Sequence, residues 1–395
     1  MSQRTSGGEL IADFAFATAS QVLFGAGRAA RLPEVVAPYG DRIFLCTGRD
    51  PDRHAGLLGG LEPAGRYAVG GEPTIGDVQT ALAAARAAGP DVLVAIGGGS
   101  AIDLAKAVGI LLAAGGGPLD YLEVVGAGAP LTGPSVPVVA VPTTAGTGAE
   151  VTANAVLSSP EHGVKASLRS PSMLPRVALV DPDLTLDCPP SVTAAGGLDA
   201  FTQCLEPLVS PQANPVTDAL ALTGLRRAGS ADGSGLRAAF ADGSNRGARA
   251  DMALCSVLGG MALANAKLGA VHGFAGVLGG RVQAAHGAIC AALLAGVVEV
   301  NLAALADRDP GNPAHNGYRA AAVAVTGSPT ATGSDLVAWI TETIRLLGIP
   351  GLSAIGVDAA DRAEIVAKAK VASSMKGNPL LLTDDELTEI LARSA

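Results

Sequence analysis

Several side chains that could bind a divalent metal stand in the second half of the chain. Asp199 and Gln203 are four residues apart in the apolar-periodic stretch 192–209, so a helix would present both on one face. His272 and His286 follow much later, and each is followed at once by a glycine, which leaves room for a bulky neighbour. One carboxylate and two imidazoles suit Fe2+ or Zn2+ with a position left open for a substrate oxygen. Taken singly, the histidines could be core residues and Asp199 a helix cap.

A glycine-rich loop in the first half has the composition of a phosphate site. The β-branched run 92–96 leads into Gly97, Gly98, Gly99 and Ser100, and a stretch of helical period follows. Glycines let a pyrophosphate approach the backbone closely, and the free N–H groups at a helix start attract its charge. The same residues could also form a plain turn between a strand and a helix.

A second loop, rich in hydroxyl groups, follows the β-branched run 138–141. It spans residues 142–150 and offers the hydroxyls of Thr143, Thr144 and Thr147. Because the carboxyl ends of parallel strands share one edge of a sheet, both loops should face one extended cofactor. The alternative is a turn that threonine hydroxyls stabilise without any ligand.

The elements that must position these residues are of two kinds. Up to about Pro190, stretches of helical period at 78–88 and 101–112 alternate with β-branched runs, which is typical of βαβ units. These runs are 43–46, 92–96, 138–141 and 177–180. Beyond Pro190 the periodicity predicts helices at 192–209, 216–227, 249–268, 287–306 and 334–347. Two stretches rich in small and polar residues predict loops with at most partial helix, namely 229–247 and 307–333.

This pattern predicts two domains, which a chain of 395 residues can accommodate. The first, residues 1–188, is an α/β dinucleotide-binding domain with a parallel sheet. The second, residues 189–395, is an all-helical metal-binding domain. A ligand would be held in the cleft between them.

Composition limits the classes of partner. No stretch offers the roughly 20 strongly apolar residues that a membrane helix needs, and the first ten residues do not resemble a secretory signal, so we expect a cytoplasmic protein with no membrane partner. A net charge of -9 without a basic cluster argues against nucleic acid and favours a small-molecule substrate. Five scattered cysteines without a C-x-x-C pair are expected to be core thiols.

Over essentially its whole length the sequence resembles the iron-dependent alcohol dehydrogenases. Residues 97–106 match that family's G-G-G-S-x-x-D-x-A-K signature, and residues 142–150 are similar to its P-T-T-A-G-T-G-S-E loop. Further similar motifs are Asp181–Pro182, Leu198–Asp199–Ala200, the two histidines His272 and His286, and Asn378–Pro379.

The resemblance implies a dehydroquinate synthase-like fold, a homodimer and the reversible, metal-dependent, NAD(P)-linked oxidation of a small alcohol to a carbonyl compound. It implies metal ligation by Asp199, His272, His286 and the residue at position 203, with catalysis at the first three. The cofactor contacts it implies are Gly48, Gly97, Gly98, Gly99, Ser100, Asp103, Thr143, Thr144, Thr147 and Lys165.

Three positions depart from the family pattern. Gln203 replaces the usual second histidine ligand with a weaker donor, although the related zinc-dependent glycerol dehydrogenases manage with one aspartate and two histidines. Gly276 replaces a further histidine, which puts the substrate in doubt. Gly48 replaces an aspartate typical of NAD-preferring members, and with Arg49 beside it we expect NADP(H) rather than NAD(H), unless Arg49 points to solvent.

Three other functions stay open on the sequence. One is a reductase similar to maleylacetate reductase that works without metal, which the changes at Gln203 and Gly276 allow. Another is a lyase of the dehydroquinate synthase type, and the third is a cofactor-binding protein without catalysis.

Overall fold

A parallel sheet forms the core of the first half of the molecule. The computed structural model describes residues 13–229 and 234–395. Six of the described strands form this sheet in the order β1-β8-β5-β4-β2-β3, and β6 and β7 form a separate antiparallel hairpin. The strands are β1 (Gln21–Phe24), β2 (Ile43–Thr47), β3 (Gly65–Ala68), β4 (Val92–Gly97), β5 (Val138–Pro142), β6 (Asn154–Ser159), β7 (Val164–Arg169) and β8 (Val177–Val180).

The central strands are apolar throughout because both faces of the sheet are covered. Along β4, Leu93 and Ala95 join a core with α2 (Ile75–Ala88) and α3 (Gly99–Ala114), whereas Val92 and Val94 join a second core with α1 (Leu32–Val36). Such double burial gives continuous β-branched runs instead of alternation. The four predicted strands are confirmed as β2, β4, β5 and β8.

The first half also contains the short α-helix α4 (Pro118–Tyr121). From Pro190 on, the described elements are helices. The α-helices of this second part are α5 (Pro190–Leu208), α6 (Pro215–Gly229), α7 (Gly235–Ala241), α8 (Arg246–Ala266), α9 (Ala270–Leu278), α10 (His286–Arg308), α11 (Ala314–Thr326), α12 (Gly333–Leu346), α13 (Arg362–Lys370) and α14 (Asp384–Arg393). The predicted fold class, a parallel α/β part followed by a helical part, is confirmed. The domain boundary after residue 188 stays a prediction.

The structure refines two predictions about the helical part. The stretch 307–333 contains α11, whose apolar face is made largely of alanines around Tyr318, so its small residues serve close packing instead of a loop. The predicted helix 249–268 is confirmed as α8, which ends two residues earlier than predicted, because Lys267 has a φ of 65° and the chain bends by 97° from α8 into α9. In the stretch 229–247, α7 is helical, and residues 230–233 lie outside the described part of the chain.

One helix also corrects the statement that no stretch is apolar enough to span a membrane. Among the described residues α10 has the length and hydropathy for a span, and 67% of its apolar window is buried inside the protein. It packs against α5, α9, α12 and α14, so its apolar character is explained by its place at the centre of the helical core.

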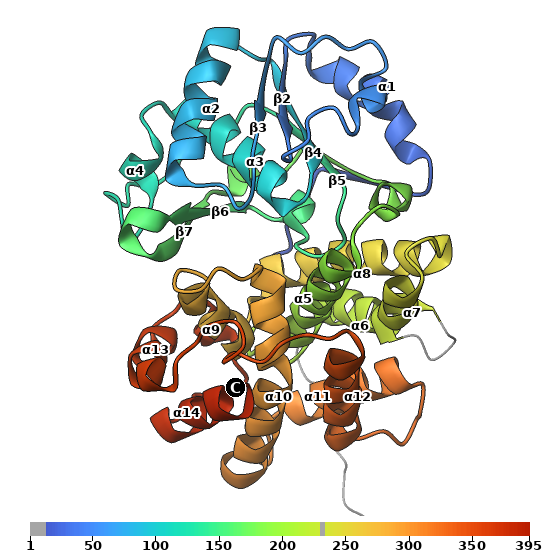
Figure 1. Cartoon of the computed structure of the whole chain (residues 1–395), viewed down its shortest axis with the longest axis vertical. Coiled ribbons are helices and arrows are strands. Elements are labelled where there is room, and N and C mark those ends of the chain that lie inside the picture. Colours follow the sequence, from blue (N-terminus) through green and yellow to red (C-terminus); the bar gives the residue numbers. More distant parts are fainter. Residues whose placement is uncertain (1–12, 230–233) are drawn as a thin grey trace, which may run out of the picture.

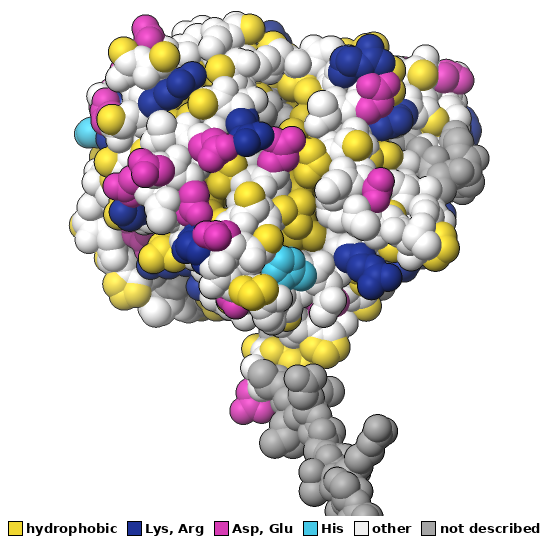
Figure 2. All heavy atoms as spheres, turned by 90° about the horizontal axis from the view of Figure 1, so that it is seen from below, with side chains coloured by type: hydrophobic (Ala, Val, Ile, Leu, Met, Phe, Trp, Pro, Cys, Tyr) yellow, Lys and Arg dark blue, Asp and Glu magenta, His cyan; other side chains and the backbone are white. Residues whose placement is uncertain are grey.

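The two parts meet along a small apolar cluster. Ala178 and Val180 of β8 pack with Val151 and with Ala253 and Val257 of α8. Figure 1 shows the sheet at one end of the molecule, the long helices at the other, and α5 and α8 next to the sheet. The face of the helical end shown in Figure 2 carries basic and acidic side chains interspersed with apolar ones.

Candidate metal and cofactor site

Three helices bring the predicted metal ligands together. Asp199 lies in the middle of α5, His272 in the first turn of α9 and His286 at the start of α10. Nε2 of His272 is 3.3 Å from Oδ1 of Asp199, and the centroids of the two imidazole rings are 5.5 Å apart. Oδ1 of Asp199 and Nε2 of His272 are buried and have no hydrogen-bond partner among the described residues. Buried donor atoms left unpaired at this distance fit a bound cation.

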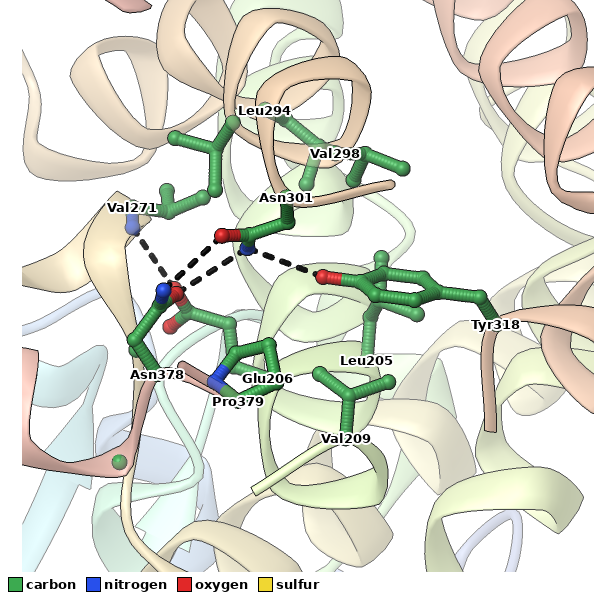
Figure 3. A pocket seen from close by; sticks show the side chains of 13 residues that line it. Leu205, Glu206, Val209, Val271, Leu294, Val298, Asn301, Tyr318, Asn378 and Pro379 are labelled. Carbon is green, nitrogen blue, oxygen red and sulfur yellow. Dashed lines mark hydrogen bonds between the residues drawn. The ribbon is translucent and has the colours of Figure 1, made fainter. Parts of the chain in front are cut away.

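Glu206 holds the ring of His272 from behind. Its Oε2 is 2.6 Å from Nδ1 of His272, and its Oε1 accepts a hydrogen bond of 2.7 Å from the backbone N–H of Val271. Figure 3 shows this carboxylate pointing at the start of α9. With Nδ1 engaged, Nε2 is left to face Asp199, which is the arrangement that metal-binding histidines use.

The Asn-Pro motif near the C-terminus supports the same helix. Oδ1 of Asn378 accepts from the backbone N–H of Ala270, and the Asn378 amide exchanges hydrogen bonds of 2.9 and 3.1 Å with Asn301. Asn301 in turn donates to the hydroxyl of Tyr318 at 3.0 Å, as Figure 3 shows. Asn378 and Glu206 thus satisfy two orphan N–H groups at the start of α9 and fix the position of His272.

Glycines let the three helices approach. A Cβ atom at Gly287 would lie 2.3 Å from the carbonyl oxygen of Ala195 and 3.3 Å from Cβ of Asp199. Only a glycine after His286 therefore allows α10 to start against α5. By contrast, a Cβ at Gly276 would meet nothing within 4 Å, so the missing histidine leaves open space one turn after His272.

Gln203 lies one turn after Asp199 and is buried. Its Oε1 has no hydrogen-bond partner within the described chain. The amide oxygen is free to bind a cation, and its role as a ligand stays a prediction.

A fourth donor, Cys290, belongs to this cluster, although we expected it to be a core thiol. The Sγ atom of Cys290 is 3.6 Å from Nε2 of His286, and one donor atom from each of Asp199, His272, His286 and Cys290 lies within 4.8 Å of the other three. The sequence indicates this position of Cys290, because Cys290 follows His286 by four residues, which places both side chains on one face of α10.

These four groups shift one another's pKa values. Burial works to raise the pKa of Asp199, but His272 and His286 hold it below its ordinary value. Burial works to lower the pKa of His272, yet Cys290 and Glu206 hold it well above the ordinary value. The thiol of Cys290 raises the pKa of His286, and against the effect of burial both histidines lower the pKa of Cys290. The four groups therefore lower the pKa values of the carboxyl and thiol groups and raise those of the two imidazoles.

The glycine loop and the threonine loop are in contact at one edge of the sheet. Gly97 ends β4 beside Pro142 of β5, and α3 begins at Gly99 with Gly98 as its N-cap and no acidic residue in its first turn. A Cβ atom at Gly98 would lie 3.1 Å from Oγ1 of Thr144, and one at Gly99 would lie 2.6 Å from Oγ1 of Thr147. The glycines leave the backbone at this helix N-terminus bare of side chains of its own, with the threonine hydroxyls beside it, which fits a pyrophosphate.

The threonine loop also links the start of α3 to the metal helix. A Cβ atom at Gly146 would lie 2.9 Å from Cα of Gly196, which is three residues before Asp199 in α5. Gly148 approaches Gly260 of α8 in the same way, at 2.5 Å. The structure therefore joins the predicted phosphate loops and the predicted metal ligands through direct backbone contact.

The remaining predicted cofactor residues lie around this edge. Gly48 directly follows β2, and its backbone nitrogen would be 3.2 Å from a Cβ atom at Gly97. Ser100 lies in the first turn of α3. Arg49 donates to the carbonyl oxygen of Gly70 at 2.7 Å, so its guanidinium is held at the protein surface instead of pointing freely to solvent.

Two of the predicted cofactor residues have other partners. The carboxylate of Asp103 pairs with Lys106 at 2.9 Å and accepts from the N–H of Val156 at 2.9 Å, so it ties α3 to β6. Nζ of Lys165 pairs with Glu72 at 2.5 Å. Their contacts with a cofactor stay predictions, as do Thr143 and the other loop contacts.

Known proteins resemble the chain along its whole length. The model of the iron-containing alcohol dehydrogenase family matches residues 19–182, and that family's C-terminal model matches residues 193–395. A 1,3-propanediol dehydrogenase of Klebsiella pneumoniae is 37% identical over 348 residues, which cover 88% of this chain and 84% of that protein.

Two solved structures have the same fold. A crystal structure of 1,3-propanediol oxidoreductase has a TM-score of 0.87 and 32% identity, and covers 97% of this chain and 100% of that chain. A sulfoacetaldehyde reductase from Bifidobacterium kashiwanohense, crystallised with NAD+, has a TM-score of 0.83 and 25% identity, with 96% and 98% covered. The chain belongs to the iron-containing alcohol dehydrogenase family and is an oxidoreductase that acts on CH–OH groups with a nicotinamide cofactor and an iron-type divalent metal.

Proposed function

We propose that this enzyme interconverts a small alcohol and its carbonyl compound at Asp199, His272 and His286, with NADP(H) preferred over NAD(H). The observation that carries the site is the pair of buried, unpartnered atoms, Oδ1 of Asp199 and Nε2 of His272, facing each other at 3.3 Å. A divalent cation, Fe2+ or Zn2+, held there would act as a Lewis acid on the substrate oxygen. The nicotinamide would give hydride to, or take it from, the adjacent carbon.

Other residues of the chain bind the cofactor, orient the metal ligands and accommodate the substrate. Gly97, Gly98, Gly99 and Ser100 hold the pyrophosphate at the start of α3, and the threonine loop sets the distance between cofactor and metal helix. Glu206 keeps the lone pair of His272 turned toward the metal. The open space at Gly276 receives part of the substrate.

The preference for NADP(H) is supported by the position of Gly48 and Arg49. A Cβ atom at Gly48 would meet nothing within 4 Å. The carboxylate that would repel a 2′-phosphate is therefore missing at this position, and no other group fills its space. Arg49, fixed on the Gly70 carbonyl, supplies a positive charge nearby. We also propose a cytoplasmic homodimer formed through the N-terminal domain, for which the exposed side chains of Phe14 and Phe16 near β1 offer apolar surface.

A direct assay tests the function. Protein purified without chelator is expected to reduce NADP+ with small primary alcohols, to lose this activity after chelation and to regain it with Fe2+ or Zn2+. The Asp199→Ala variant is expected to show no such recovery. Full activity after complete metal removal would instead favour the metal-free reductase, an alternative that the dehydrogenases among the relatives do not favour.

A further inference from the structure

Cys290 lies within reach of the same point as the three predicted metal ligands. It is fully buried in α10, one turn after His286. We propose that Cys290 is a thiolate ligand of the metal, so that the donor set is one carboxylate, two imidazoles and one thiolate. This inference rests on the proposed function, because it concerns the same metal site.

Two distances between donor atoms match the edges of a tetrahedral zinc site. Bonds of about 2.3 Å to sulfur and about 2.0–2.1 Å to nitrogen and oxygen imply edges of about 3.6 Å between S and N and about 3.3 Å between N and O. The Sγ of Cys290 is 3.6 Å from Nε2 of His286, and Nε2 of His272 is 3.3 Å from Oδ1 of Asp199. All four donors lie within 4.8 Å of one another, which places them around one point.

A second, independent observation points to a ligand at this place. Oδ1 of Asp199 and Nε2 of His272 lie 3.3 Å apart and are buried without a hydrogen-bond partner in the described chain, although the thiol of Cys290 lies close by. A hydrogen bond from Cys290 to His286 alone would leave both atoms orphaned, which costs free energy. One cation bound by all four donors leaves none of them unsatisfied.

The chemistry of this set differs from that of a site with three histidines. Binding of the metal displaces the proton of the Cys290 thiol to solvent, and the thiolate contributes a negative charge that neither Gln203 nor a histidine could supply. Thiolates are soft donors that select zinc over harder cations. The weaker donor at Gln203 is therefore compensated from α10, and the site is tuned toward zinc.

X-ray absorption at the zinc edge of the full-length, zinc-loaded enzyme tests the inference without depending on turnover. We expect one sulfur scatterer at about 2.3 Å together with nitrogen and oxygen scatterers at about 2.0–2.1 Å. The Co2+-loaded enzyme should show a thiolate-to-cobalt charge-transfer band. Zinc bound by nitrogen and oxygen alone would overturn the thiolate ligand and leave the proposed function standing.

Variants separate the role of Cys290 from a general effect on the fold. Cys290→Ala and Cys290→Ser are expected to lose the sulfur signal and the cobalt band, and to bind zinc at least about tenfold more weakly in chelator competition. Cys255→Ala, the same change at a buried thiol of α8, and Gln203→Ala should keep both signals. A wild-type enzyme that binds no metal would overturn the metal site, and the proposed function with it.

Discussion

At the scale of single residues, Glu206 decides how His272 is presented. Its two oxygens are both occupied, one by the ring nitrogen Nδ1 and one by the N–H of Val271. Glu206→Gln keeps the shape but removes the charge and one acceptor. We expect metal affinity to fall about 10–100-fold in chelator competition.

The matched control for this change is Glu299→Gln. Glu299 also lies in the helical part, but it is partly exposed and pairs with Arg393 at 2.7 Å. Its substitution should leave metal affinity unchanged. Equal affinities for the two variants would mean that Glu206 has only a structural function.

Cofactor preference is a second property set by one residue. A side chain at Gly48 enters open space, so Gly48→Asp can be introduced without a clash. The new carboxylate should accept from the ribose hydroxyls of NAD(H) and repel the 2′-phosphate of NADP(H). We expect the ratio of kcat/KM for the two cofactors to move toward NAD(H) by about tenfold or more, which is about 1.4 kcal/mol.

Gly48→Asn separates charge from size in this experiment. It has nearly the same volume as aspartate but no charge. It should move the ratio much less, and the same shift for both variants would show that repulsion is not the cause.

At the scale of elements, the approach of α10 to α5 depends on Gly287. A Cβ atom there would press on the backbone carbonyl of Ala195 at 2.3 Å, and backbone cannot move aside as a flexible side chain can. We expect Gly287→Ala to lower the free energy of unfolding by about 1–3 kcal/mol and to weaken metal binding, because the two helices move apart. Chemical denaturation and metal titration measure these effects.

Gly276→Ala provides the comparison. The added methyl group meets nothing within 4 Å, and alanine favours a helix over glycine by about 1 kcal/mol. This variant should be as stable as the wild type or slightly more stable. A loss of stability equal to that of Gly287→Ala would contradict the packing argument.

A buried acid at the end of the threonine loop, Glu150, makes stability depend on pH. Burial raises the pKa of Glu150 to about 7 from its ordinary 4.5, against the opposing effect of Lys106. The folded state therefore holds this proton more tightly than the unfolded state, and stability is full below about pH 4.5 and falls as pH rises through 7. Glu150→Gln should abolish this loss, which amounts to about 3 kcal/mol above pH 7.

Denaturation curves at pH 5 and pH 8 measure the effect. The difference in unfolding free energy between Glu150→Gln and wild type should grow toward pH 8. Glu161→Gln, a change of the same kind at an exposed position, should give parallel curves. Parallel curves for Glu150→Gln as well would refute the assignment.

At the scale of the whole molecule, the metal connects three helices that are distant in the chain. It would join α5, α9 and α10, so binding should stabilise the folded helical part by mass action, by about 2.7 kcal/mol at a metal concentration 100 times Kd. Removal of the metal should lower Tm, and the Asp199→Asn variant should unfold at one temperature with or without metal. If chelation left the Tm of the wild type unchanged, the protein would not hold a bound cation that stabilises it.

Much of the architecture could be predicted from local patterns. Strands β2, β4, β5 and β8 are continuous apolar runs because both faces are buried, and such runs are visible in the sequence. The edge strands β1 and β3 are short and only partly buried, so their composition carried little signal. Helix α11 was missed because its buried face consists mainly of small alanines, and the Gly, Pro and Asn residues of the same stretch indicated a loop.

The sequence by itself determined the kinds of donor, their motifs and the order of strand, loop and helix, since these depend on residue type and on neighbours a few positions away. Only the tertiary structure decided that Cys290 faces Asp199 and His272, that Glu206 pairs with His272, and that α10 starts against α5. Such contacts depend on the angles at which helices pack, above all the 97° bend between α8 and α9. The contacts themselves join residues far apart in the chain, such as Glu206 and His272, so no local stretch of sequence encodes where the metal ligands meet.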